Sequence, residues 1–265
     1  MAEQGLSAQQ RAYLEAMGID VLVSRAAAAP VAEVAVMPEP AAPVTEATVM
    51  TEATLPAPEP AAADTELRWQ GLRQAVARCT QCRLHETRTQ SVFGVGPRDA
   101  RLMVIGEAPG AEEDRTGEPF VGRAGHMLDA MLRAIGCDRD TVFIANTIKC
   151  RPPGNRDPRV DEVTACNDYL EQLLTAVAPD VVIAVGRIAA QRLLQVEMPL
   201  GRMRGKTHQL PDRDVPLVVT YHPAYLLREP AQKARAWEDL KRVRALLEAA
   251  SRVRPATFWS PRFGP

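Results

Sequence analysis

Residues 102–110 read Leu-Met-Val-Ile-Gly-Glu-Ala-Pro-Gly, an apolar run followed directly by a loop rich in glycine and proline. A short apolar run bounded by turn residues is typical of a strand that is buried in a sheet. Similar runs occur further along the chain, at 142–145, 181–185 and 217–220. We therefore predict four buried strands, of which the first covers 102–105.

The segments between these strands have helical periodicity. Apolar residues follow i, i+3, i+4, i+7 spacing within 124–135 and within 163–177, and a further helix is predicted over 231–249. Strands that alternate with helices form a parallel sheet covered on both faces. We predict the α/β class, as a three-layer α/β/α sandwich around a central four-stranded parallel sheet. Ligands of such sheets bind at the carboxyl ends of the strands.

The N-terminal quarter of the chain has a different composition. Residues 26–63 contain 14 alanines and 7 prolines, too much proline for a continuous helix and too little apolar surface for a core. We predict a short helical segment over 1–25, a disordered linker over 26–65, a folded domain over 66–250 and a tail over 251–265. The extension either tethers a helix that binds a protein partner or is dispensable.

Composition and charge narrow the class of protein. Of the 265 residues, 46% are hydrophobic and 25% charged, as in an ordinary globular protein. No run of about 18 apolar residues predicts a membrane span, and the first residues do not resemble a signal peptide, so we expect a cytoplasmic protein. Residues 1–66 carry ten acids and two bases, whereas the remainder carries 30 bases and 23 acids. A basic domain suits nucleic acid as a partner.

Polar side chains follow three of the predicted strands. Glu107 lies in the loop after the first strand, Asn146 follows the second, and His222 follows the fourth. Neither the GxxxxGK[ST] phosphate loop nor the GxGxxG dinucleotide motif is present, which disfavours nucleotide triphosphates and NAD. An asparagine amide offers a donor and an acceptor to the edge of a planar ligand. The pattern predicts a site at this edge of the sheet.

The five cysteines suggest a metal centre more than disulfides, given a reducing compartment. Cys79 and Cys82 form a CxxC pair, which suits zinc or an iron–sulfur cluster. Cys150 and Cys166 lack a CxxC partner of their own, which disfavours a zinc ribbon made of two such pairs. Alternatively, Cys166 is a core residue, because it lies on the apolar face of its predicted helix. Cys137 has no evident role.

Taken together and in this order, the motifs resemble those of the family 4 uracil-DNA glycosylases, the iron–sulfur-containing branch of their superfamily. The resemblance covers residues 79–247, about two thirds of the chain. It includes CTQCRL (79–84), GEAPG (106–110), EED (112–114), GEPFVGRAG (117–125), NTIKCRPPGNR (146–156) and HPAYLLR (222–228).

The resemblance implies a monofunctional glycosylase that flips uracil out of single- or double-stranded DNA and hydrolyses its N-glycosidic bond, leaving an abasic site. It implies that Glu107 and Ala108 line the uracil pocket through their backbone, that Phe120 stacks on the base, and that Asn146 pairs with its polar edge. His222 would face O2 of the base. The catalytic residues implied are His222, Asn146 and Glu107, and we expect the enzyme to act at the nucleoid.

The resemblance also implies a cofactor, held by Cys79, Cys82, Cys150 and Cys166 as ligands of a [4Fe–4S] cluster. Because hydrolysis needs no electron transfer, we expect a structural role for the cluster rather than a redox role. A zinc-stabilised DNA-binding module without a catalytic pocket is the rival interpretation of these cysteines.

Further residues match family positions near the DNA. Leu226 and Leu227 resemble an apolar wedge that fills the space left by the flipped base, with Arg228 near the phosphates. Glu113 and Asn155 match polar positions near the pocket. Better-known relatives carry an Asp, which orients the attacking water, where this chain has Ala108. That role is left open between Asn155 and Glu107.

Three alternatives remain within or near this function. One is a non-catalytic or covalent uracil-DNA-binding protein of the same superfamily, although the basic insertion of the covalent binders is missing after Cys150. Another is the same enzyme with wider specificity, for hypoxanthine or mismatched thymine. The last is the zinc module. In the absence of a heptad pattern we expect a monomer.

Overall fold

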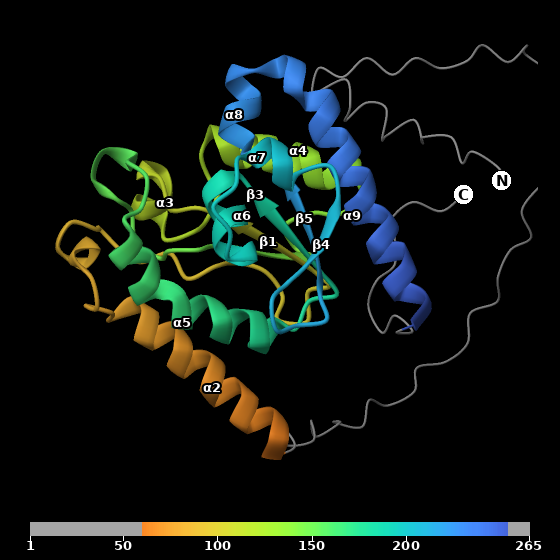
Figure 1. Ribbon diagram of the computed structural model, residues 1–265. Coiled ribbons are helices and arrows are strands. Elements are labelled where there is room, and N and C mark those ends of the chain that lie inside the picture. The colour runs from red at the N-terminus through yellow and green to blue at the C-terminus, as the bar shows by residue number, and fades with distance from the viewer. Residues whose placement is uncertain (1–59, 254–265) are drawn as a thin grey trace, which may run out of the picture.

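A five-stranded sheet forms the centre of the computed structural model, which describes residues 60–253 (Figure 1). The strands are β1 (Leu102–Gly106), β2 (Val142–Asn146), β3 (Val181–Val185), β4 (Thr207–Gln209) and β5 (Pro216–Thr220), in the order β2-β1-β3-β5-β4. The first three of these are buried at every residue, as expected of parallel strands covered on both faces. The sheet therefore confirms the four predicted strands and their parallel arrangement.

The prediction of a four-stranded sheet was nevertheless wrong in its count. A fifth strand, β4, pairs antiparallel with β5 at the edge of the sheet, where Thr207 lies opposite Val218. Its sequence is Thr-His-Gln, and two of its three residues are exposed. A three-residue polar strand at a sheet edge has no apolar run, so hydrophobic periodicity gives no signal for it.

Helices cover both faces of the sheet, as predicted for a three-layer sandwich. On one face α2 (Pro60–Ala77), α5 (Val160–Val177), α6 (Arg187–Leu194) and α7 (Leu200–Met203) enclose a core with alternate strand residues such as Met103 and Ile105. On the other face α4 (Arg123–Ala134), α8 (Pro223–Arg228) and α9 (Lys233–Val253) pack on Leu102 and Val104. Figure 1 shows α2 lying along α5 on the first face, and α4, α8 and α9 on the second.

Short helices complete the connections. They are η1 (Arg83–Glu86), α3 (Ala111–Thr116), η2 (Pro153–Asn155) and η3 (Pro230–Gln232). Three of them (η1, α3 and η2) overlap the motifs quoted above.

The boundary between linker and domain differs from the prediction. Helix α2 begins at Pro60, so residues 60–65 of the predicted linker are helical. Proline is compatible with the first position of a helix, and the alanines at 61–63 are strong helix formers. The segment 1–25, the rest of the linker and the end of the tail lie outside the described residues. Within 60–253, no helix has the length and apolar character needed to span a bilayer.

Candidate active site

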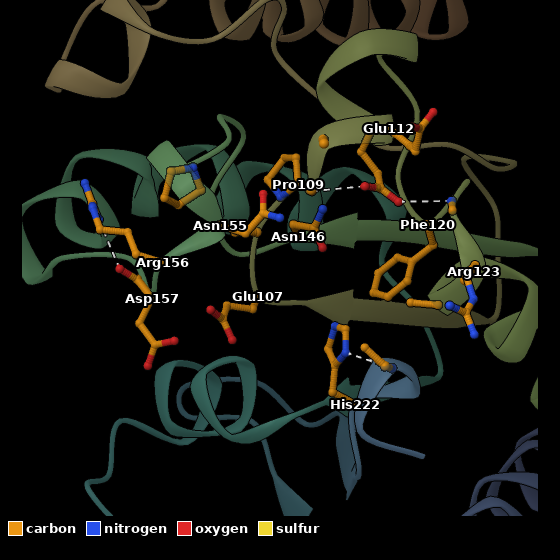
Figure 2. A pocket seen from close by; sticks show the side chains of 18 of the residues that line it. Glu107, Pro109, Glu112, Phe120, Arg123, Asn146, Asn155, Arg156, Asp157 and His222 are labelled. Atoms are coloured by element: carbon orange, nitrogen blue, oxygen red, sulfur yellow. Dashed lines mark hydrogen bonds between the residues drawn. The ribbon is translucent and has the colours of Figure 1, made fainter. Parts of the chain in front are cut away.

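A cavity of about 570 Å³ opens at the carboxyl edge of the sheet, where the loops after β1, β2 and β5 meet the start of α4. We refer to it as the edge cavity. It brings together all five residues predicted to bind the base: Glu107, Ala108, Phe120, Asn146 and His222. Figure 2 shows the side chains of Phe120, Asn146 and His222 around one shared space. Glu113, Asn155 and Arg228 also line it.

Gly106 leaves room for two side chains of the edge cavity. It ends β1, opposite Asn146 at the end of β2. A Cβ atom at this position would lie 2.5 Å from Oδ1 of Asn146 and 2.6 Å from Cζ of Phe120. Both side chains thus occupy space that any residue other than glycine would fill.

The amide of Asn146 is buried, with 1% of the residue exposed. In the described part of the chain its Oδ1 atom has no hydrogen-bond partner. Because buried polar atoms are nearly always paired, an unpaired acceptor in the wall of a cavity indicates a ligand that donates a hydrogen bond there.

The backbone of Phe120 is held in a left-handed conformation, with φ of 54°. Arg139 donates to the carbonyl oxygens of Phe120 and Pro119, at 2.9 and 2.5 Å, and pairs with Asp129 at 3.0 Å. A Cβ atom at Gly125 would lie 1.8 Å from the Phe120 oxygen. These contacts fix the phenyl ring, which lies 5.7 Å from the His222 ring, centroid to centroid.

His222 caps the N-terminus of α8. Its Nδ1 accepts a hydrogen bond from the backbone N–H of Ala224 at 3.2 Å. Burial and, to a smaller extent, the positive charge of Arg228 lower the pKa of His222 to about 4, against the opposing charge of Glu113. A neutral ring with an acceptor at Nδ1 carries its proton on Nε2. Gly186, at φ +104°, makes room for this ring, because its own Cβ would lie 3.2 Å from that of His222.

Glu107 contributes a carboxyl group to the wall of the edge cavity. Burial and, to a smaller extent, the nearby charge of Asp157 raise its pKa to about 7, against the opposing charge of Arg187. The backbone carbonyl of Glu107 accepts two hydrogen bonds from residues that follow β2. One comes from Oγ1 of Thr147 at 2.6 Å and the other from the N–H of Ile148 at 3.2 Å. The loop is therefore anchored while its carboxyl group is close to half-protonated at neutral pH.

The two other polar residues predicted near the pocket have partners of their own. Glu113 accepts from the backbone N–H groups of Gly110, Val121 and Gly122, and so ties the two loops of the cavity together. Asn155 accepts from Nε of Arg151 at 2.7 Å. The N–H of Gly110 is consequently engaged by Glu113 and does not face a ligand.

Of the two leucines predicted to form the wedge, only Leu227 is exposed enough to contact DNA. Leu226 is 1% exposed and packs in the core with α4 and α9, which contradicts its assignment as a wedge. It occupies the inner face of the short helix α8, and a one-dimensional motif does not show which of two adjacent leucines faces inward. Leu227 is 37% exposed, and Arg228 lines the edge cavity.

Some residues of the site carried no role in the sequence analysis. Arg123 lines the edge cavity from the first position of α4, inside the quoted GEPFVGRAG motif. Arg139 lies outside every quoted motif, and its role depends on contacts with a loop 20 residues earlier. No sequence signal marks it.

The four predicted ligand cysteines line a second, smaller hollow with Arg88, Lys149 and Tyr169; we call it the cysteine hollow. Arg88 donates to Sγ of Cys150 at 2.9 Å, and the N–H of Lys149 donates to Sγ of Cys166 at 3.4 Å. All five cysteines are free thiols, and Cys137 lies in the other core. Within residues 60–253, no three His, Cys, Asp or Glu side chains converge closely enough to ligate a single metal ion.

Burial dominates the electrostatics of the cysteine hollow. It raises the pKa of the Cys82 and Cys150 thiols, and that of Cys166 to about 11. It also lowers the pKa of Lys149 to about 8, against the influence of Cys166 and Cys150. Without a positive partner, the thiolate forms are therefore unfavourable in this hollow.

Comparison with known proteins adds an independent line of evidence. Residues 93–241 match the family model of the uracil DNA glycosylase superfamily. The chain is 43% identical to the type-4 uracil-DNA glycosylase of Archaeoglobus fulgidus over 171 residues, 62% of this chain and 86% of the relative. It is 38% identical to that of Thermotoga maritima over 179 residues, 66% of this chain and 92% of the relative.

More distant relatives fall in the same superfamily. A type-5 uracil-DNA glycosylase of Pyrobaculum aerophilum is 34% identical over 116 residues, 38% of this chain and 51% of the relative. The type-4 matches are longer and more similar, and they confirm the resemblance predicted from the motifs. The chain belongs to the uracil DNA glycosylase superfamily and, within it, to the type-4 uracil-DNA glycosylases.

Proposed function

We propose that the protein excises uracil from DNA by hydrolysing the N-glycosidic bond, which leaves free uracil and an abasic site for base excision repair. The type-4 relatives are uracil-DNA glycosylases by name. The observation that carries the proposal at the level of chemistry is the buried, unpaired Oδ1 of Asn146 in the edge cavity.

Asn146 recognises the base by hydrogen bonds to its polar edge. Uracil carries a donor at N3 and an acceptor at O4, which match the oxygen and the nitrogen of one amide. Cytosine has an acceptor at N3 and a donor at its amino group, so with the Asn146 amide in its present orientation both pairings would fail and leave buried polar groups unpaired. Sites of this kind discriminate strongly because the wrong ligand leaves their own groups without partners.

Phe120 provides the stacking surface for the extruded base. Base–aromatic stacking contributes about 1–3 kcal/mol, which helps to offset the few kcal/mol needed to unstack a nucleotide. The ring is held in place by the Gly106, Gly125 and Arg139 contacts before any base enters. No reorganisation of the platform is then required on binding.

His222 stabilises the leaving group. Cleavage of the N-glycosidic bond leaves negative charge on uracil, and the neutral imidazole donates a hydrogen bond from Nε2 toward O2. The Ala224 N–H on Nδ1 fixes the tautomer that makes this donation possible. Donors aimed at a developing anion contribute about 10²–10³-fold in rate.

Glu107 orients the attacking water. Of the two candidates, Asn155 already accepts from Arg151, whereas the carboxyl group of Glu107 faces the edge cavity with a pKa of about 7. A base whose pKa lies near the working pH is suited to accept a proton from water. Arg228 and Arg123, which line the edge cavity, bind the phosphates of the DNA backbone. Leu227, which is partly exposed, enters the space in the duplex that the flipped base leaves.

The residues of the cysteine hollow fit a [4Fe–4S] cluster. Four thiols from three separate segments share one hollow, and N–H donors from Arg88 and Lys149 already point at two of the sulfurs. A cluster of this type takes one thiolate at each iron, so its ligands need not converge on one point as those of zinc do. When bound, it supplies iron–sulfur bonds that hold the segment of Cys79 and Cys82 against the loop of Cys150 and helix α5.

Single-turnover cleavage of a uracil-containing oligonucleotide tests the function. We expect alkali-labile strands from the wild type and a loss of about 10²–10³-fold in Asn146→Ala and His222→Ala. Asn167→Ala is the matched control, because its buried amide oxygen is also unpaired but lies on α5, away from the edge cavity. A denaturation-resistant protein–DNA adduct would instead identify a covalent binder. The cytoplasmic location, monomeric state and any partner of segment 1–25 stay predictions.

A further inference from the structure

Lys149 is a buried charged side chain that the proposed reaction does not use. Only 1% of its surface is exposed, and it ranks among the largest fully buried side chains of the described residues. A buried ammonium is costly unless it donates hydrogen bonds to well-placed acceptors. The acceptor that the structure gives its Nζ is the backbone carbonyl of Asn146, at 2.9 Å.

The position of Lys149 connects two sites. Its side chain lines the cysteine hollow, its N–H donates to Sγ of Cys166, and its carbonyl accepts from the N–H of Val92 at 2.7 Å. Its backbone is therefore held by Cys166 of the hollow and by Val92, while its ammonium holds the residue whose amide lines the edge cavity. The two sites lie at opposite ends of residues 146–150.

The Asn146 carbonyl needs such a donor because β2 ends there. Thr147 turns away to donate to Gly106 and Glu107, and β2 is at the edge of the sheet. The Lys149 ammonium thus satisfies the last carbonyl of the strand from inside the hollow. A shift of this peptide group would displace the unpaired Oδ1 with it.

We propose that Lys149 is a positioning residue for base recognition: by holding the Asn146 peptide from inside the cysteine hollow, it makes uracil affinity depend on an intact hollow. The inference rests on the proposed function. A change at the hollow is then transmitted to the edge cavity through one side chain, and by thermodynamic reciprocity a base in the cavity stabilises the arrangement of the hollow.

The test uses the purified brown protein and two DNA probes, one with an uncleavable 2′-fluoro-2′-deoxyuridine and one with an abasic-site analogue. The ratio of the two dissociation constants isolates binding of the base from binding of the backbone. The variants are Lys149→Met, which removes the donor, and Lys149→Gln, which keeps a neutral donor. Ile148→Val is the matched packing control, since Ile148 is fully buried beside Lys149.

We expect Lys149→Met to weaken binding of the fluorinated uracil probe about 10- to 100-fold, as for loss of a hydrogen bond from a charged donor. Binding of the abasic probe and visible absorbance per protein should stay unchanged, and Lys149→Gln should recover part of the loss. Ile148→Val should match the wild type in all three measurements.

Two results would overturn the proposal. Equal losses for both probes would assign Lys149 a general structural role. Loss of the visible absorbance in both Lys149 variants would mean that the residue serves the hollow and not Asn146. Failure of the wild type to cleave uracil-containing DNA would contradict the proposed function itself. That result needs no Lys149 variant, so it is distinguishable from failure of the present proposal.

Discussion

The edge cavity and the cysteine hollow lie at the two ends of the same stretch, residues 146–150, yet they are built in opposite ways. The edge cavity is open and lined by groups already aimed at a ligand: an unpaired Asn146 oxygen, a fixed Phe120 ring and a neutral His222. The cysteine hollow is small, and burial raises the pKa of its Cys82, Cys150 and Cys166 thiols. The fold therefore preorganises the cavity for its ligand. The hollow, in contrast, would gain stability from the cluster that we propose for it.

This difference predicts that variants of the edge cavity lose rate first. Gly106→Ala is the sharpest case, because its methyl group would enter the space of Asn146 and Phe120. We expect the single-turnover rate to fall about 10²–10³-fold, since displacements of about 1 Å at a reacting site cost that much. Gly201→Ala is the control, as its Cβ would meet nothing within 4 Å. A Gly106→Ala protein of wild-type rate would show that the cavity is less rigid than its geometry implies.

The charge state of Glu107 sharpens the same comparison. With a pKa of about 7, the carboxylate form should set the rate, which we expect to be about a hundredfold lower at pH 5 than on a plateau above pH 8. His222, with a pKa of about 4, stays neutral over this range. Glu107→Gln should be slow and should lack the slope between pH 5 and pH 8. A wild-type slope that persists in this variant would assign the titration to another group.

The raised pKa of Glu107 also has a consequence for stability. The folded state binds this proton more tightly than the unfolded state, whose carboxyl group titrates near 4.5. The contribution to folding is therefore complete below about pH 4.5 and is lost as the pH rises through 7. Glu107→Gln should remove this loss, which thermal unfolding at pH 5 and pH 8 would detect. Protonation of Glu107 thus lowers the rate of cleavage and raises the stability of the fold.

Variants of the cysteine hollow should lose stability first. We expect Cys166→Ser to lose the brown colour and to lower the melting temperature by about 5–10 °C, as for a loss of a few kcal/mol in a domain of this size. Cys137→Ser is the matched control, because both residues are about 5% exposed and each would bury a hydroxyl group in an apolar core. Equal effects in the two variants would make Cys166 a core residue and would contradict the cluster.

Much of this architecture was predictable from the sequence, for a physical reason. Parallel strands buried on both faces appear as apolar runs, and the residues directly after them must share one edge of the sheet. The grouping of Glu107, Asn146 and His222 in one site was therefore predictable from the sequence. Polar edge strand β4 and the roles of Arg139 and Lys149 were not, because they depend on pairing and hydrogen bonds between segments that carry no local pattern.

Leu226 and Leu227 show the same limit within a single motif, and they give the prediction with the smallest effect on rate. Leu226 is buried against α4 and α9, so Leu226→Ala should cost about 2–5 kcal/mol of unfolding free energy. Leu227→Ala should leave thermal stability unchanged and lower the rate on double-stranded DNA several-fold, with no loss on single-stranded DNA, where no stacked partner needs replacing. Adjacent leucines would then affect separate quantities, because one belongs to the core and the other to the DNA. If Leu227→Ala changes the rate on single-stranded and double-stranded DNA by the same factor, the wedge assignment is wrong. Leu227 would then be only a surface residue of helix α8.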